Sequence, residues 1–224
     1  MAKKEYTIGK KYTHRQLMEL AVQEMYNSIP DPNRSDDNPN PKVGAVIATN
    51  ERVLISTSHR GELRIGDHAE FTAIERKNRG IKLNDLVIYA TLEPCAPGAR
   101  NHPKLSCAER IVNARFAKVY IGHIDPDPSV AGDGRDFLLA NNIEVDYFED
   151  DLVEEIYQAN KKFFDDATLR AHEFNPNPLL PKPTILTQGL GNFDISDLSE
   201  EAQQELINRL NLGFKINSYS ARRP

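Results

Sequence analysis

Apolar residues recur at helical spacing close to the start of the chain. The stripe consists of Leu17, Leu20, Ala21 and Met25. Residues three or four positions apart share one face of a helix, so this stripe predicts a helix with one core-facing side. The segment 13–16 (Thr-His-Arg-Gln) comes just before it and has the capping-box pattern, in which Thr and Gln satisfy free N–H groups of the first turn.

The pattern then changes from helical to extended. Residues 31–41 are rich in Pro, Asn and Asp, which favour turns and interrupt regular hydrogen bonding, so we predict an irregular loop. Two short β-prone runs follow, Val43–Ala48 and Val53–Ser58, with residues 49–52 between them. Two such runs joined by a short polar segment predict an antiparallel hairpin.

Helical and extended patterns alternate over the next hundred residues or so. We predict helices over 68–77, 107–114, 136–141 and 152–164, and strands over 86–91, 119–122 and 143–147. Strands that alternate with helices are typical of a layered α/β domain with a mostly parallel sheet. With the hairpin, the predicted sheet has five strands and is mixed.

The composition shifts from about Glu173 onward. Asn175–Pro178 and Pro181–Pro183 cannot sustain a helix or a central strand, which predicts a linker or arm. One amphipathic helix is expected afterwards, over Leu198–Leu210, and its apolar face must pack on the main domain, a second copy, or residues outside this sequence. We therefore divide the chain into a domain over 1–172 and a C-terminal extension over 173–224.

The bulk composition is that of a soluble globular protein. Of the 224 residues 39% are hydrophobic and 27% charged, and no apolar run approaches the roughly 18 residues of a membrane span. The net charge of −5 argues against broad nucleic-acid binding. The first residues lack the apolar stretch of a secretory signal, so a cytoplasmic location is expected, and there the two cysteines would ligate a metal or stay reduced.

Two short motifs carry candidate chemistry. His68-Ala69-Glu70 is followed by Pro94-Cys95 and then by Cys107. Zinc deaminases of nucleobases use a His-x-Glu motif and two later cysteines, with the glutamate acting as acid and base rather than as a ligand. A catalytic zinc has three protein ligands and one open position. This pattern predicts Zn²⁺ held by His68, Cys95 and Cys107, with Glu70 moving protons.

Both metal-binding segments read as helix starts. Residues 67–70 (Asp-His-Ala-Glu) and 106–109 (Ser-Cys-Ala-Glu) each place a capping side chain three positions before a glutamate. A helix N-terminus favours negative charge, which would support a thiolate at Cys107. The alternative is that Glu70 only caps its helix and that the His and the two Cys are ordinary structural residues.

At this point the chain resembles the cytidine-deaminase-like zinc deaminases, and among them the deaminase domain of riboflavin biosynthesis, which acts on a phosphoribosylated diaminopyrimidine. The matching segments are Asn40–Val46, His68–Glu70, Thr91–Cys95, Cys107–Glu109, Asp125–Pro128 and Val130–Gly134. The resemblance implies a three-layer α/β/α domain with zinc between two helix starts. It also implies that Asn40 hydrogen-bonds the substrate ring and that His59 and Arg100 lie near the ribose phosphate.

Three departures from the family pattern bear on the substrate. The eleven residues 96–106 separate the two cysteines, a longer loop than usual, with Leu105-Ser106 where the family has Pro-Pro. This loop carries Arg100, His102 and Lys104, three cations able to bind a phosphate. Asp127 replaces the usual Asn of an Asp-Pro-Asn-Pro turn, and the tail beyond residue 164 is too short for the reductase domain often fused to these deaminases.

Three functions stay open from the sequence. The first is a deaminase of a phosphorylated aminopyrimidine or related nucleotide. The second is a base deaminase of RNA or single-stranded DNA, for which Arg100, Lys104 and the terminal Arg222-Arg223 would follow a backbone. The third is a non-catalytic zinc module in which His102 supplies a fourth ligand. The family self-associates, so a homo-oligomer is also expected.

Overall fold

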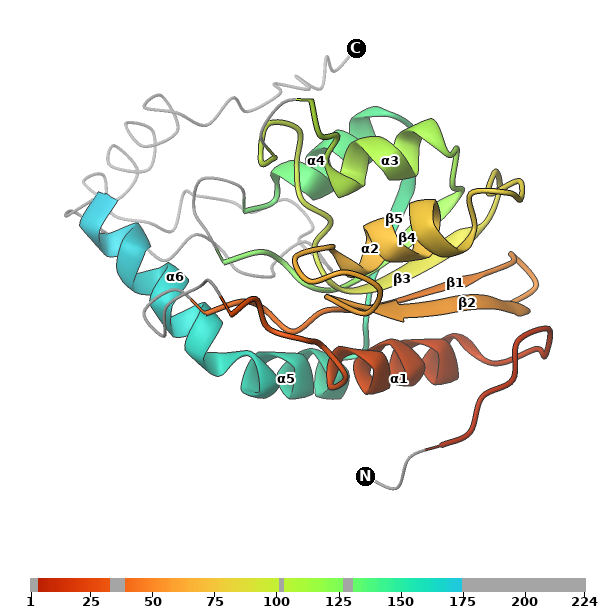
Figure 1. Cartoon of the computed structure of the whole chain (residues 1–224), viewed down its shortest axis with the longest axis horizontal. Helices are drawn as coiled ribbons and strands as arrows, with labels where there is room; N and C mark the ends of the chain where they lie inside the picture. Colours follow the sequence, from red (N-terminus) through yellow and green to blue (C-terminus); the bar gives the residue numbers. More distant parts are fainter. Residues whose placement is uncertain (1–3, 33–38, 101–102, 127–130, 175–224) are drawn as a thin grey trace, which may run out of the picture. The chain divides into compact units, whose positions relative to one another are not determined.

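One mixed sheet carries the fold (Figure 1). The computed structural model describes residues 4–32, 39–100, 103–126 and 131–174. The strands are β1 (Gly44–Ala48), β2 (Leu54–His59), β3 (Val87–Leu92), β4 (Lys118–His123) and β5 (Glu144–Tyr147). Their order is β2-β1-β3-β4-β5, and β1 runs antiparallel to both of its neighbours while β3, β4 and β5 are parallel. The predicted mixed five-stranded sheet is confirmed, since only β1 opposes the direction of the other strands.

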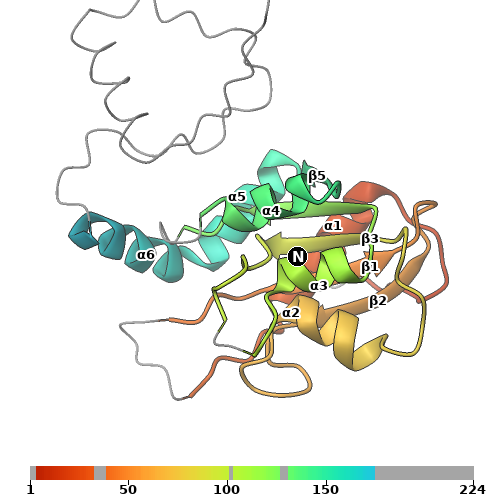
Figure 2. The same cartoon turned by 90° about the horizontal axis from the view of Figure 1, so that it is seen from above.

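Helices cover both faces of this sheet (Figure 1). The helices α1 (His14–Met25) and α5 (Asp150–Ala159) lie on one face, and α2 (Ala69–Phe71), α3 (Cys107–Asn113) and α4 (Asp133–Ala140) lie on the other. A sixth helix, α6 (Lys161–Phe174), follows α5. The view from above in Figure 2 shows α2 and α3 next to each other over the sheet. The three-layer α/β/α architecture is therefore confirmed.

The central strands β1 and β3 are buried along their whole length because both of their faces are covered. Side chains along a strand point alternately to the two faces. In β3, Val87 and Tyr89 join the core formed with α1 and α5, whereas Ile88 joins the core formed with α3 and α4. The sheet thus separates two of the three apolar clusters found among the described residues. No helix in the described part of the chain is long and apolar enough to cross a membrane.

The capping predictions hold at two of three helix starts. Thr13 and Gln16 form a complete capping box at α1, and Ser106 and Glu109 form one at α3. The prediction for Asp67 was wrong: His68 is the N-cap of α2 without a side-chain capping bond, and the Asp67 carboxylate instead accepts from Arg76 Nε at 3.2 Å. Arg76 follows later in the same helical segment, which continues from α2 as a π-helix over Thr72–Lys77.

The predicted closing helix over 152–164 is two helices rather than one. Helix α5 ends at Ala159, Asn160 leaves helical geometry with φ −113° and ψ 13°, and α6 begins at Lys161. The break arises because the buried Asn160 side chain is hydrogen-bonded to the backbone of Lys42, far away in the sequence. Helix α6 runs to Phe174, across the expected domain boundary at 172, while the expected helix 198–210 lies outside the described residues.

Candidate active site

The topology brings the ends of three strands and the start of a fourth to one edge of the sheet. Strands β2, β3 and β4 end at this edge, and β1 begins there because it is antiparallel to β2 and β3. Ligand sites in α/β sheets form outside the carboxyl ends of the strands. The residues that follow β2, β3 and β4, and those that precede β1, therefore meet the starts of α2 and α3 at this edge.

His68, Cys95 and Cys107 meet at this edge of the sheet. His68 is the N-cap of α2, Cys95 follows the end of β3, and Cys107 is the first residue of α3. One ligand atom from each lies within 4.8 Å of the others. Among the described residues this is the group of His, Cys, Asp and Glu side chains spaced to hold a metal ion.

The distances in this group fit a tetrahedral metal. His68 Nδ1 lies 3.7 Å from Cys95 Sγ and 3.5 Å from Cys107 Sγ. In an ideal tetrahedral zinc site with Zn–S of about 2.3 Å and Zn–N of about 2.0 Å, a nitrogen and a sulfur are roughly 3.5 Å apart. The donor set of one imidazole and two thiols is also one that zinc prefers. The three residues thus form a candidate site for one such ion.

The start of α3 polarises the two thiols. The backbone N–H of Cys107 donates to Cys95 Sγ at 3.2 Å, as expected where a helix N-terminus faces a thiolate. A hydrogen bond from the Cys107 thiol, with help from His68, holds the pKa of Cys95 well below its usual range. The same bond and complete burial raise the pKa of Cys107. Burial also lowers the pKa of His68, which keeps the ring neutral, as a metal ligand must be.

Glu70 lies two residues after His68 and only 3% of it is exposed. Burial, followed by the nearby charge of Cys95, raises the pKa of Glu70 to about 7. A carboxyl group whose pKa is near neutrality can both take up and release a proton, which is the property of a general acid and base. His68 rather than Asp67 is the N-cap of α2 and forms no side-chain capping bond, so Glu70 is not part of the predicted capping box.

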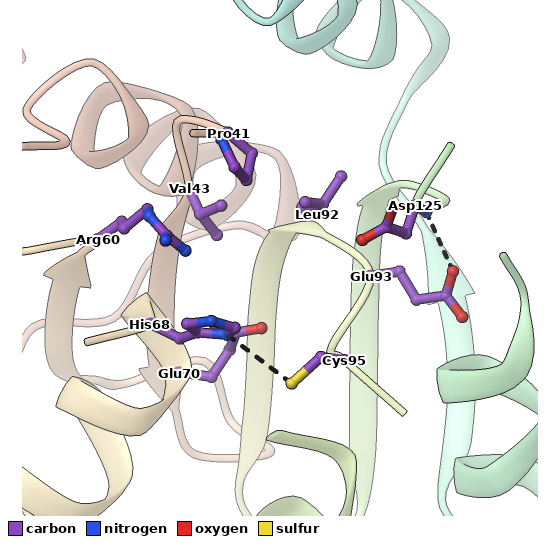
Figure 3. A pocket seen from close by; sticks show the side chains of 9 residues that line it. All are labelled: Pro41, Val43, Arg60, His68, Glu70, Leu92, Glu93, Cys95 and Asp125. Atoms are coloured by element: carbon purple, nitrogen blue, oxygen red, sulfur yellow. Dashed lines mark hydrogen bonds between the residues drawn. The ribbon is translucent and has the colours of Figure 1, made fainter. Parts of the chain in front are cut away.

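A cavity of about 60 Å³ opens beside these residues (Figure 3). Its lining residues are Pro41, Val43, Arg60, His68, Glu70, Leu92, Glu93, Cys95 and Asp125. Arg60 and Asp125 lie on opposite sides of it in Figure 3. The sequence reasoning missed Arg60, although its position directly after a strand that ends beside a metal motif could have marked it.

Glu93 stabilises the side of the cavity on which Asp125 lies. Its buried carboxylate accepts hydrogen bonds from three backbone N–H groups, those of Asp125 at 3.1 Å, Gly132 at 3.0 Å and Arg135 at 2.8 Å. Figure 3 shows this carboxylate turned toward Asp125 and away from His68. Glu93 therefore ties the end of β3, which leads to Cys95, to the segment between β4 and α4.

The predicted substrate-binding residues have different positions. Asn40 Oδ1 accepts from an Arg60 guanidinium nitrogen at 2.9 Å, so Asn40 is one hydrogen bond from the cavity lining. His59 instead faces α1, with Nδ1 3.0 Å from Glu24 Oε2. Arg100 contributes positive charge at His68 and Cys107.

Of the two other cations of the loop between the cysteines, the structure describes one. Lys104 is exposed and is absent from the lining, whereas His102, like Asp127, lies outside the described residues.

Fold and site together define a three-layer α/β/α protein with a candidate His/Cys/Cys metal site and a buried glutamate beside it. Residues 11–123 match the family model for the cytidine and deoxycytidylate deaminase zinc-binding region. This match covers half of the chain, and the chain belongs to that family.

Within this family, the chain is similar to deaminases of one particular name. The chain is 34% identical over 154 residues to the diaminohydroxyphosphoribosylamino-pyrimidine deaminase of Schizosaccharomyces pombe. The matched region covers 66% of this chain and 36% of the relative. It is 34% identical over 109 residues to the deaminase of the same name from Buchnera aphidicola. That matched region covers 48% of this chain and 68% of the relative. The chain thus spans about a third of the length of the first of these relatives.

A solved structure supports the same grouping. The diaminohydroxyphosphoribosylaminopyrimidine deaminase/5-amino-6-(5-phosphoribosylamino)uracil reductase of Thermotoga maritima is 28% identical and superposes with a TM-score of 0.56. The superposition covers 70% of this chain and 41% of that protein. The similarity is therefore confined to part of the longer Thermotoga maritima protein.

Proposed function

We propose that this protein is a zinc-dependent hydrolytic deaminase of a phosphorylated aminopyrimidine of the riboflavin-pathway type. One observation carries the proposal: His68, Cys95 and Cys107 form a zinc-sized triangle at a cavity whose wall includes the buried Glu70. A structural zinc site has no need of a cavity or of a carboxyl group with a pKa near neutrality. The named activity of the relatives agrees with the proposed reaction.

In this proposal each residue has a separate task. His68, Cys95 and Cys107 hold the zinc, which when bound makes a water molecule acidic enough to act as a nucleophile near neutral pH. Glu70 accepts one proton from the attacking water and gives it to the ring nitrogen. It then accepts the second proton from the hydroxyl group added to the ring and gives it to the leaving amino group. The oxygen of water becomes bonded to the ring carbon, the C–N bond breaks, and ammonia leaves.

The charge around the cavity supports a phosphorylated substrate. Arg100 contributes positive charge at His68, and Lys104 follows in the same loop with an exposed side chain. A positive charge that acts on the metal-site residues suits a ligand whose ring enters the cavity while its phosphate stays outside. Asn40 and His102 remain predicted contacts of the ring and the phosphate.

Ammonia release tests the proposal. Purified protein is first analysed for zinc, with one ion per chain expected. It is then assayed with diaminohydroxyphosphoribosylaminopyrimidine phosphate, cytidine, deoxycytidylate and a single-stranded oligonucleotide. The first compound should give the highest kcat/KM, and Glu70→Gln should lower kcat by at least about 10²-fold without loss of zinc. Glu144→Gln, at an exposed glutamate on β5, is the matched control.

The remaining outcomes separate the alternatives. Turnover of the oligonucleotide alone, with binding that weakens steeply with salt, would identify a nucleic-acid deaminase. Zinc with four protein ligands and no turnover of any compound would identify a structural module. The cytoplasmic location and the homo-oligomer expected from the sequence stay predictions.

A further inference from the structure

Arg60 lines the cavity, whereas its neighbour His59, which the resemblance placed near the ribose phosphate, does not. His59 is the last residue of β2 and points toward α1, where it contacts Glu24. The next residue along an extended chain points to the opposite face. Arg60 accordingly lies on the α2 side, lines the cavity with His68 and Glu70, and is only 8% exposed.

The backbone of Arg60 is fixed by hydrogen bonds on both sides. Its N–H donates to the Val43 carbonyl at 2.9 Å, and its carbonyl accepts from the N–H of Ile29 at 2.9 Å. Gly61 follows with φ +79°, and a Cβ at this position would come within 2.7 Å of the Ile29 carbonyl oxygen. The direction of the Arg60 side chain is therefore set by the fold before any ligand arrives.

Asn40 fixes the guanidinium itself. A guanidinium has five N–H donors and no acceptor, so the atom of Asn40 that faces it at 2.9 Å must be the amide oxygen. This bond orients the planar group. Figure 3 shows the Arg60 side chain in the cavity wall. An arginine held in this way presents further N–H donors in a rigid fork, which suits an acceptor on a planar ligand.

We propose that Arg60 is a specificity-determining residue whose guanidinium donates a hydrogen bond to an acceptor on the substrate ring, such as its oxo group, and that Asn40 positions Arg60. The inference rests on the proposed function. The ring, rather than the phosphate, lies against Arg60 because the amino carbon must approach the metal ligands and Glu70, and Arg60 shares the cavity with these residues.

Three ligands separate the possible roles of Arg60. They are diaminohydroxyphosphoribosylaminopyrimidine phosphate, the same compound with hydrogen in place of the ring oxygen, and the same compound without its phosphate. Dissociation constants are measured by calorimetry on zinc-loaded protein carrying Glu70→Gln, so that no ligand is consumed. Arg60→Ala should weaken binding of the oxo compounds about 10- to 100-fold, with or without phosphate, and should change binding of the deoxo analogue less than about 3-fold.

Further variants guard against a purely structural explanation. Arg60→Gln keeps a donor for Asn40 without the charge and should fall between wild type and Arg60→Ala, while Arg60→Lys should recover part of the loss. Arg64→Ala removes an exposed arginine from the same loop and should bind all three ligands as wild type does. Asn40→Ala should act mainly through Arg60, so the double variant should lose less than the sum of the two single losses.

Each result decides the assignment. Equal losses for the oxo and deoxo ligands would overturn it, because a structural role affects both alike. A loss confined to phosphorylated ligands would overturn it in favour of a phosphate contact, and absence of binding to the parent protein would overturn it together with the proposed function. Arg60-dependent binding of the oxo ligands without ammonia release by the protein with Glu70 intact would support Arg60 and overturn the deaminase alone.

Discussion

The side chain of Asn160 is hydrogen-bonded to both polar groups of the Lys42 backbone. Lys42 N–H donates to Asn160 Oδ1 at 2.6 Å, and Asn160 Nδ2 donates to the Lys42 carbonyl at 3.1 Å. These residues are 118 positions apart, and Asn160 lies where α5 gives way to α6. The helix break therefore supports the segment that carries Asn40 and Pro41 to the cavity.

Replacing Asn160 should destabilise the domain. In Asn160→Ala the N–H and carbonyl of Lys42 lose the buried side chain that they bond to, and the loss of two such hydrogen bonds costs about 1–3 kcal/mol in total. Urea unfolding measures the change. Gln158→Ala, which removes an exposed side chain bonded to Glu154 on the same helix, should change the free energy of unfolding by less than about 0.5 kcal/mol. Similar losses of stability in both variants would show that the hydrogen bonds between Asn160 and Lys42 have no special role.

Gly44 allows α1 to approach β1 closely. A Cβ at this position would lie 2.0 Å from the Ala21 carbonyl oxygen and 2.5 Å from the Met25 nitrogen, both of them backbone atoms. Gly44→Ala should therefore cost at least about 2 kcal/mol, because the helix and the strand must separate. At Gly80 an added Cβ meets nothing within 4 Å, so Gly80→Ala serves as the control and should be close to neutral. The two midpoints of thermal unfolding should differ clearly, and equal midpoints would contradict this account.

Removal of metal should leave a folded protein with a lower melting temperature. The candidate metal ligands lie at the ends of elements that apolar packing already holds in place, so the fold does not need the ion to form. Dialysis against a chelator should preserve the far-ultraviolet circular dichroism, and added Zn²⁺ should restore the melting temperature. Cys107→Ser should abolish this response to zinc. An apoprotein without helical signal would show instead that metal binding and folding are coupled.

Acid should destabilise the protein in part through His14. His14 Nδ1 lies 2.7 Å from Tyr89 Oη, and burial, aided by the charges of Arg52 and Lys118 and opposed by Asp146, lowers the pKa of His14. The folded state keeps the ring neutral while the unfolded chain takes up a proton near pH 6.5. The stability due to His14 is thus present above pH 6.5 and is lost as the pH falls toward the lower folded-state value.

His14→Gln tests this pH dependence. Glutamine can still bond to Tyr89 but does not titrate, so the free energy of unfolding should fall less between pH 7.5 and pH 5.5 in the variant than in the wild type. Denaturant titrations at both pH values give the comparison, and other titrating groups cancel in the difference between the two proteins. Parallel pH profiles would exclude a contribution from His14.

The local sequence was sufficient where the determining interactions are short in range. The capping boxes at Thr13 and Ser106 depend on residues three positions apart, and the period of apolar residues follows from helix and strand geometry. The three residues that the structure brings together as candidate metal ligands could also be selected from the sequence, because few side chains bind zinc and the His68-x-Glu70 motif leaves little choice among them. Because helix and strand periods are local properties, the number of strands and the layered α/β class could also be predicted from the sequence.

Tertiary structure alone decided the features that depend on contacts between distant segments. Whether His59 or Arg60 faces the cavity depends on where β2 ends relative to α1 and α2, and a shift of one residue exchanges the two faces. The break at Asn160 requires Lys42 as a partner, and a helical pattern contains no trace of that contact. Local periodicity records which side of an element is apolar, whereas only the packed chain determines which polar groups meet.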